Sequence, residues 1–60
     1  MNDNIYEFSY RDEEGDTYTS DEYPSIASAI REIKIVQKEG GTILETWCYK
    51  NGIYKGSFNY

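Results

Sequence analysis

Four carboxylates fall within the five-residue segment Asp12-Glu13-Glu14-Gly15-Asp16. Paired carboxylates act as acid and base in glycoside hydrolysis, and carboxylate oxygens also bind Ca²⁺. The acid role requires apolar surroundings that raise a carboxyl pKa, and this segment contains no apolar side chain. The spacing also differs from that of an EF-hand, which alternates its ligands and ends on a distal Glu. We therefore expect a solvated turn with no catalytic residue, no bound metal and no cofactor.

Nucleophilic chemistry is limited to one thiol, Cys48, in a chain without His. Without an imidazole, the usual general base near neutral pH is missing. Cys48 is expected on the polar face of a strand near Lys50 and Lys55, where a structural thiol is favoured over a reactive one. Gly40-Gly41 follows a predicted helix instead of opening one, which excludes a phosphate loop at a helix N-terminus. The sequence thus predicts that the protein is not an enzyme.

The net charge of −5 is unevenly distributed along the chain. Residues 1–24 hold eight acids against Arg11, a balance of −7, whereas residues 25–60 have a balance of +2. An acidic half repels phosphate backbones and favours partners with a basic surface, although acidity also serves solubility alone. Aromatic residues on a sheet can stack on nucleic-acid bases, but that mode needs a basic groove. The charge distribution therefore disfavours nucleic acid as a partner.

Length and hydropathy indicate a single small domain, residues 1–60, near the lower limit for a chain that folds on its own core. No apolar run approaches the roughly 20 residues of a membrane span, and residues 1–4 lack the features of a signal peptide. We expect a cytoplasmic protein that does not associate with membranes and whose thiol stays reduced. A single Cys excludes an internal disulfide, so stability must come from aromatic packing or self-association.

Residues 5–11 alternate in character, which predicts a β-strand with one aromatic face. That face is formed by Tyr6, Phe8 and Tyr10. The acidic segment then follows as a hairpin loop, in which Gly15 supplies the left-handed residue. A second strand is predicted over residues 17–22, with Tyr10 opposite Tyr18 and Phe8 opposite Ser20.

Pro24 and Ser25 mark the start of an amphipathic helix of about 13 residues, with Ser25 capping free backbone N–H groups. Its apolar stripe, spaced by three and four residues, consists of Ile26, Ala29, Ile30, Ile33 and Val36. Gly40-Gly41 ends the helix, with one glycine in the left-handed C-cap conformation. Ile35 points almost opposite to the stripe, where a monomer would carry a polar side chain.

Residues 42–50 predict a third strand, and Asn51-Gly52 is typical of a type I′ turn that leads into a fourth strand over residues 53–60. The register of this hairpin pairs Tyr49 with Tyr54, Trp47 with Gly56, Glu45 with Phe58 and Ile43 with Tyr60. The opposite face, which includes Cys48, is mixed and mostly polar. The predicted fold is α+β with the order ββαββ: an antiparallel four-stranded sheet from two hairpins, with one helix packed on its aromatic face.

Ten aromatic residues exceed what the apolar stripe of one helix can enclose. The remaining rings form either ordinary amphipathic surface or an interface, where Tyr and Trp concentrate. Ile35 lies between basic residues of the helix and favours a helix-mediated contact. We predict a homodimer that pairs helix to acidic hairpin, or edge strand to edge strand. The candidate self-association residues are Ile35, Arg31, Lys38, Tyr54 and Tyr60.

The acidic segment, the aromatic strands and the short chain resemble small phage-encoded inhibitors, such as the uracil-DNA glycosylase inhibitors and the Hachiman anti-defence family. The resemblance implies a protein that binds and blocks a host protein, involved in defence or nucleic-acid processing, through acidic groups that imitate a DNA backbone. The acidic hairpin would bind this partner through Asp12, Glu13, Glu14 and Asp16. The alternative is a structural or regulatory small protein whose aromatic surface serves only self-association or assembly.

Overall fold

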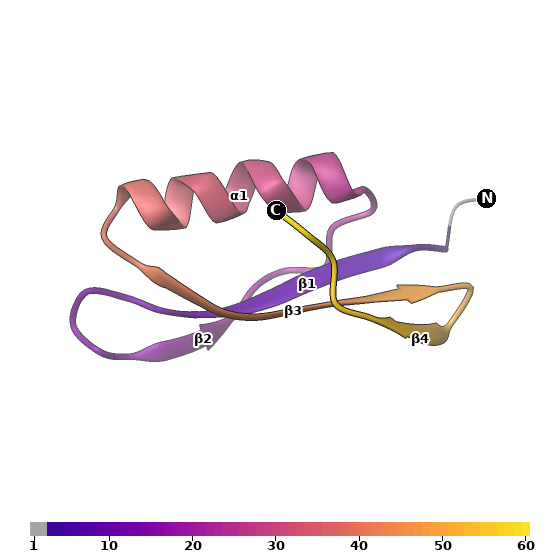
Figure 1. Ribbon diagram of the computed structural model, residues 1–60, viewed down its shortest axis with the longest axis horizontal. Coiled ribbons are helices and arrows are strands. Elements are labelled where there is room, and N and C mark those ends of the chain that lie inside the picture. The colour runs from indigo at the N-terminus through magenta and orange to yellow at the C-terminus, as the bar shows by residue number, and fades with distance from the viewer. Residues whose placement is uncertain (1–2) are drawn as a thin grey trace.

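The computed structural model describes residues 3–60 as one helix packed on one face of a four-stranded antiparallel sheet (Figure 1). The strands are β1 (Ile5–Arg11), β2 (Thr17–Thr19), β3 (Thr42–Lys50) and β4 (Ile53–Gly56), and the helix is α1 (Ile26–Lys38). The strand order is β2-β1-β3-β4, so the two hairpins meet through β1 and β3 at the centre of the sheet. The predicted ββαββ fold of the α+β class is confirmed.

The ends of α1 follow the predicted capping signals. The Ser25 hydroxyl accepts the N–H of Ser28 at 3.2 Å, which satisfies one of the free donors of the first turn. At the other end Gly40 has a φ of 91°, and Gly41 donates its N–H to the Val36 carbonyl at 2.9 Å. These bonds terminate the helix and turn the chain into β3.

The core lies between α1 and the sheet. Phe8 and Ala29 are fully buried and Ile33 is nearly so, while the other buried side chains are Tyr6, Cys48 and Phe58. Aromatic rings contact one another here: Tyr6 meets Phe58 edge-on with centroids 5.6 Å apart, and Phe8 stacks on Tyr23 at 6.3 Å. One residue of the predicted helix stripe does not take part, because Ile26 remains 41% exposed at the start of the helix.

The aromatic residues are divided between the two faces of the sheet, which corrects the prediction of a single aromatic face covered by the helix. Cross-strand partners lie on the same face, and Tyr6 pairs with Cys48, so the Cys48 thiol belongs to the buried face under α1. Glu7 pairs with Trp47, which places the Trp47 indole on the open face of the sheet. The expected position of Cys48 on a polar face is therefore wrong.

Two register shifts occur in the sheet, one in the second hairpin and one between β1 and β3. Tyr49 pairs with Tyr54 as predicted, but Cys48 pairs with Gly56, whose φ of 89° marks a β-bulge. The predicted pairing of Trp47 with Gly56 is therefore wrong. A second shift, between Ser9 and Tyr10 on β1, pairs Tyr10 with Ile43.

β4 ends at Gly56, so the predicted strand over residues 53–60 is too long. Beyond it, the Phe58 N–H donates to the Thr46 hydroxyl at 3.2 Å, and this hydroxyl donates to the Phe58 carbonyl at 2.9 Å. The Phe58 ring is thereby buried against the core, and its predicted pairing with Glu45 does not form. No strand pairing joins Ile43 to Tyr60 among the described residues.

The second strand is also shorter than predicted, because β2 ends at Thr19 instead of continuing to residue 22. The Ser20 hydroxyl accepts the Phe8 N–H at 3.0 Å, and the Ser20 N–H donates to the Phe8 carbonyl at 2.8 Å. The predicted pairing of Tyr10 with Tyr18 is confirmed. The chain then crosses to α1 through an isolated bridge between Tyr6 and Tyr23.

We predict that the Cys48 thiol reacts with a soluble disulfide reagent only after local or global opening, because it is 5% exposed in the native fold. The measurement compares labelling rates in buffer and in denaturing urea. The Cys48→Ser variant carrying a new thiol at exposed Thr19 (Thr19→Cys) is the control and should label rapidly in both. Rapid labelling of native Cys48 would contradict its position under α1.

Candidate functional site

The acidic hairpin loop is held in one conformation by the first of its own carboxylates. Asp12 Oδ1 accepts the N–H groups of Glu14 and Asp16 at 3.0 and 2.9 Å. The Asp12 N–H donates to the Asp16 carbonyl, and Gly15, with a φ of 91°, closes the turn. The loop therefore presents its remaining carboxylates from a fixed backbone.

Carboxylate oxygens of Asp12, Glu14 and Asp16 come within 4.8 Å of one another. Asp12 is half-buried, whereas Glu14 and Asp16 are exposed, and exposed acidic groups are common without an ion. Their spacing concentrates negative charge at one end of the molecule. This charge is the main electrostatic feature of the loop.

The loop forms one wall of a groove of about 370 Å³, and the C-terminal half of α1 forms the other. We call this the acidic groove. Its lining residues are Tyr10, Asp12, Glu13, Glu14, Glu32, Ile35, Val36, Glu39 and Gly41. Five of them carry carboxylates, no basic residue lines the groove, and Tyr10, Ile35 and Val36 provide apolar surface. The groove thus combines dense negative charge with hydrophobic contact area.

The two glycines after α1 allow the loop and the helix to approach each other. A side-chain Cβ at Gly40 would lie 3.0 Å from Glu13 Oε2, and one at Gly41 would lie 2.6 Å from Val36 Cγ1 and 3.2 Å from the Arg11 carbonyl. At Gly41 there is therefore no room for a side chain, whereas at Gly40 it is the positive φ that favours glycine, because the Glu13 side chain can move. The sequence identified the glycines only as a stop signal.

We predict that Gly41→Ala destabilises the protein by about 1–3 kcal/mol, the usual cost of forcing an extra methyl into a packed site. The backbone carbonyls that face the new methyl cannot rotate away as a flexible side chain could. Urea unfolding measures the change in the free energy of unfolding, with Thr42→Ala as a neighbouring control. Unchanged stability would show that the contact between β1 and the end of α1 yields easily.

The negative charge of the loop raises the pKa of a tyrosine on β2, Tyr18. The negative charges of Asp12 and then Asp16 raise the pKa of Tyr18 above its ordinary value of 10.0, and a hydrogen bond to Asp12 adds to the effect. Burial raises the pKa of Tyr23, with smaller contributions from the charges of Glu32 and Asp21. Both phenols therefore remain neutral hydrogen-bonding groups beside the acidic surface.

We predict that Asp12→Asn lowers the pKa of Tyr18, because the amide keeps the Oδ1 acceptor but removes the largest charge that opposes phenolate formation. Absorbance of the phenolate against pH, with Tyr18→Phe subtracted, measures the shift. Glu45→Gln on β3 is a neutralisation away from this phenol and should leave the titration unchanged. Since the native state holds the Tyr18 proton more tightly than the unfolded chain, its contribution to stability is constant at low pH and is lost as the pH rises past 10.0.

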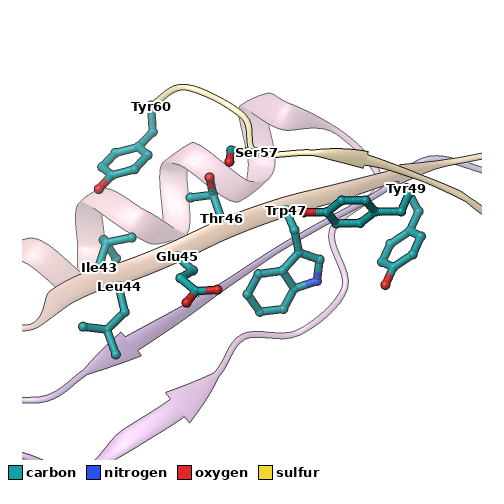
Figure 2. A pocket seen from close by; sticks show the side chains of 9 residues that line it. Ile43, Leu44, Glu45, Thr46, Trp47, Tyr49, Ser57 and Tyr60 are labelled. Carbon is teal, nitrogen blue, oxygen red and sulfur yellow. The ribbon is translucent and has the colours of Figure 1, made fainter.

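A second, larger groove of about 640 Å³ runs along the edge of β3, as Figure 2 shows. We call this the aromatic groove. Its lining residues are Ile43, Leu44, Glu45, Thr46, Trp47, Tyr49, Tyr54, Ser57 and Tyr60. Trp47 and Tyr49 hang on the open side of the strand, whereas Tyr60 stands on the side that carries α1. The groove therefore wraps around the strand edge and includes parts of both faces.

The walls of the aromatic groove are fixed by contacts within the sheet. The Trp47 Nε1–H donates to Glu7 Oε1 at 3.1 Å, which ties the indole to β1. The rings of Tyr49 and Tyr54 meet edge-on, with centroids 5.7 Å apart. Tyr54 and Tyr60 nevertheless stay 61% and 54% exposed, so this groove has apolar surface to offer.

The structure distributes the candidate residues from the sequence over both grooves. Asp12, Glu13 and Glu14 line the acidic groove, and Ile35 joins them there, although the sequence assigned it to a separate self-association surface. Asp16 belongs to the loop but does not line the groove. Tyr54 and Tyr60 line the aromatic groove. Arg31 and Lys38 are exposed on α1 and line neither groove.

Sequence reasoning missed two carboxylates of the acidic groove, Glu32 and Glu39. Their spacing from Ile35, three residues before and four after, places all three on one flank of the helix, which was a usable signal. Leu44 and Trp47 were missed as groove residues because their position depends on where β4 ends.

The fold and grooves define a small two-layer α+β protein with two open surface grooves and no enclosed cavity among the three hollows described for residues 3–60. Comparisons with protein-family models, curated proteins and solved structures find no match to this chain. Within residues 3–60, no helix is both long enough and apolar enough to cross a membrane.

Proposed function

We propose that this protein is a non-enzymatic binding module that attaches to a basic surface of another protein through the acidic groove, and that it acts as an inhibitor of that protein. The observation that supports the proposal is the convergence of five carboxylates from the hairpin loop, α1 and its C-cap around Tyr10, Ile35 and Val36. Charged groups steer and orient a partner, while the apolar residues supply area that is desolvated on contact.

The chemistry of the groove favours a cationic, amphipathic segment as its partner. Lys or Arg side chains fit the rim of carboxylates, and an aliphatic side chain fits the surface formed by Ile35 and Val36. The fixed loop reduces the entropy lost on binding, since Asp12 already holds the backbone of Glu14 and Asp16. The partner class that these features favour is a host protein whose basic surface normally binds another acidic ligand.

We predict that the double variant Glu32→Gln/Glu39→Gln binds a synthetic amphipathic Lys/Leu peptide about 2- to 30-fold more weakly than the parent, from roughly 0.2–1 kcal/mol for each exposed charge. The matched control is Asp21→Asn/Glu22→Gln, which removes the same charge outside the groove and should bind almost as the parent does. Isothermal titration calorimetry at low and physiological ionic strength measures both effects. Equal weakening by the two variants would mean that net charge, not the groove, attracts the peptide.

The inhibitor role is tested by capture from the native host with the tagged protein. One stoichiometric partner, lost on charge reversal of Glu13, Glu14 and Asp16, supports the proposal. A partner retained by that variant would remove the acidic hairpin from the mechanism. Recovery of self-contacts alone would favour a structural or assembly protein.

The structural alternative is supported by a separate observation. Leu44, Ile53, Tyr54 and Tyr60 are between 39% and 61% exposed, and all of them belong to β3, β4 and the tail that follows. Exposed apolar side chains concentrated in one part of so small a chain are typical of a self-association surface. This surface does not share a lining residue with the acidic groove.

A further inference from the structure

β3 has a free edge along its N-terminal half. β4 pairs only with the segment Cys48–Lys50, and the tail reaches β3 through the side chain of Thr46. No strand of residues 3–60 lies beside residues 42–47 on this side. An uncovered strand edge is a template for pairing with another chain unless it is blocked.

The backbone groups available on this edge follow from the alternation of an antiparallel ladder. Tyr6 and Phe8 direct their backbone groups away from β3, toward Tyr23 and Ser20. Tyr10, two residues further along β1, directs its groups toward β2 in the same way. Its partner on β3, Ile43, therefore points its backbone N–H and carbonyl toward the free edge.

The aromatic groove surrounds this edge, so a strand that pairs here also contacts side chains on both faces. Trp47 and Tyr49 lie on one side and Tyr60 on the other (Figure 2). Leu44, 39% exposed, lies in the unpaired part of β3. Glu45 is the one charged residue that lines the groove, so the surface is dominated by apolar and hydrogen-bonding groups.

We propose that a second copy of this chain occupies the aromatic groove, with the β3 edges of two copies pairing antiparallel about a twofold axis. This contact is separate from the acidic groove, which is the surface proposed for partner binding. Of the two predicted forms of the homodimer it is the edge-to-edge form, with β3 as the contacting strand. The helix residues Arg31 and Lys38 then lie outside the contact.

Charge distribution favours a second copy as the occupant. The strand order places the acidic β1–β2 hairpin at the opposite edge of the sheet from β4. In each copy the acidic hairpin belongs to residues 1–24, whose charge balance is −7. Pairing through β3 therefore keeps the two hairpins apart, at the outer edges of a continuous sheet. Pairing through β2 would bring these hairpins together.

The exposed surface area and the small core also favour a dimer. Each copy exposes 4276 Å², and a standard interface of roughly 800 Å² per partner needs about a fifth of that surface. Phe8 and Ile33 are the large side chains that are fully buried in the described chain, which is a small core for a domain of this length. Burial of the groove side chains in a dimer would extend that core.

The decisive comparison is between Leu44→Lys and Ile35→Lys, measured by sedimentation equilibrium over a range of micromolar concentrations. Both residues are about equally exposed, at 39% and 41%, but only Leu44 lies at the proposed contact. The parent should be a dimer. Leu44→Lys should weaken dimerisation by about 10-fold or more, because a twofold axis applies each substitution to both copies, whereas Ile35→Lys should remain dimeric.

A monomeric parent would overturn the proposal, as would a Leu44→Lys variant that stays fully dimeric. Loss of the dimer in Ile35→Lys alone would move the contact to the helix. Open-ended association would also overturn it, since a twofold contact closes. If Leu44→Lys fails to fold by circular dichroism, Tyr60→Ser at the exposed chain end replaces it and should weaken the dimer.

Two further readouts separate this inference from partner binding. The Ile43 amide should be protected from hydrogen exchange in the parent and exchange faster in Leu44→Lys, a change that a remote contact would not cause. Added salt should weaken peptide binding in the acidic groove but leave the dimer nearly unchanged. Leu44→Lys should still bind the cationic peptide, so each proposal can fail while the other stands.

Discussion

Phe8 lies fully buried between α1 and the sheet, and it pairs with Thr46 on β3. This pairing sets the register of β3 against β1, and the position of the chain after the helix depends on that register. Because side chains alternate along a strand, this one pair places Cys48 under the helix and Trp47 on the open face. The Thr46 hydroxyl then holds both backbone groups of Phe58, which returns the tail to the core. A slip of one residue between β1 and β3 would exchange the buried thiol for the indole and release the tail.

The parts of the fold that sequence predicts well are those set by neighbouring residues. Asn51-Gly52 fixes its hairpin through two positive φ angles, and Ser25 caps the helix at the expected residue. The register of β1 against β3 cannot be predicted in this way, because the helix and its connections separate the two strands in the sequence and no turn joins them. The alternation of side chains along β3 is compatible with burial of either of its faces. The sequence therefore does not determine whether Trp47 or Cys48 lies in the core.

In the candidate site, too, the sequence predicts the local features but not the contacts between distant segments. The hairpin carboxylates stand out by composition, but their meeting with Glu32 and Glu39 depends on Gly40 and Gly41 bringing the loop against the helix. The aromatic groove depends on a still finer feature, the bulge at Gly56 that ends β4 and leaves the first half of β3 uncovered. A glycine with a positive φ in a strand is a known bulge signal, yet its effect on a neighbouring strand edge emerges only in three dimensions.

The two grooves rely on different forces, which is why one small chain can carry both. Negative charge and a fixed loop characterise the acidic groove, whereas a bare strand edge and aromatic rings characterise the other. The proposed pairing through β3 would leave the acidic grooves of both copies outside the contact, so a dimer would carry two of them. For a partner with two basic surfaces, the second binding event becomes intramolecular, and avidity rises without a larger interface on either copy. For such a partner, self-association would strengthen binding through avidity, because the two grooves share no lining residue and can be occupied together.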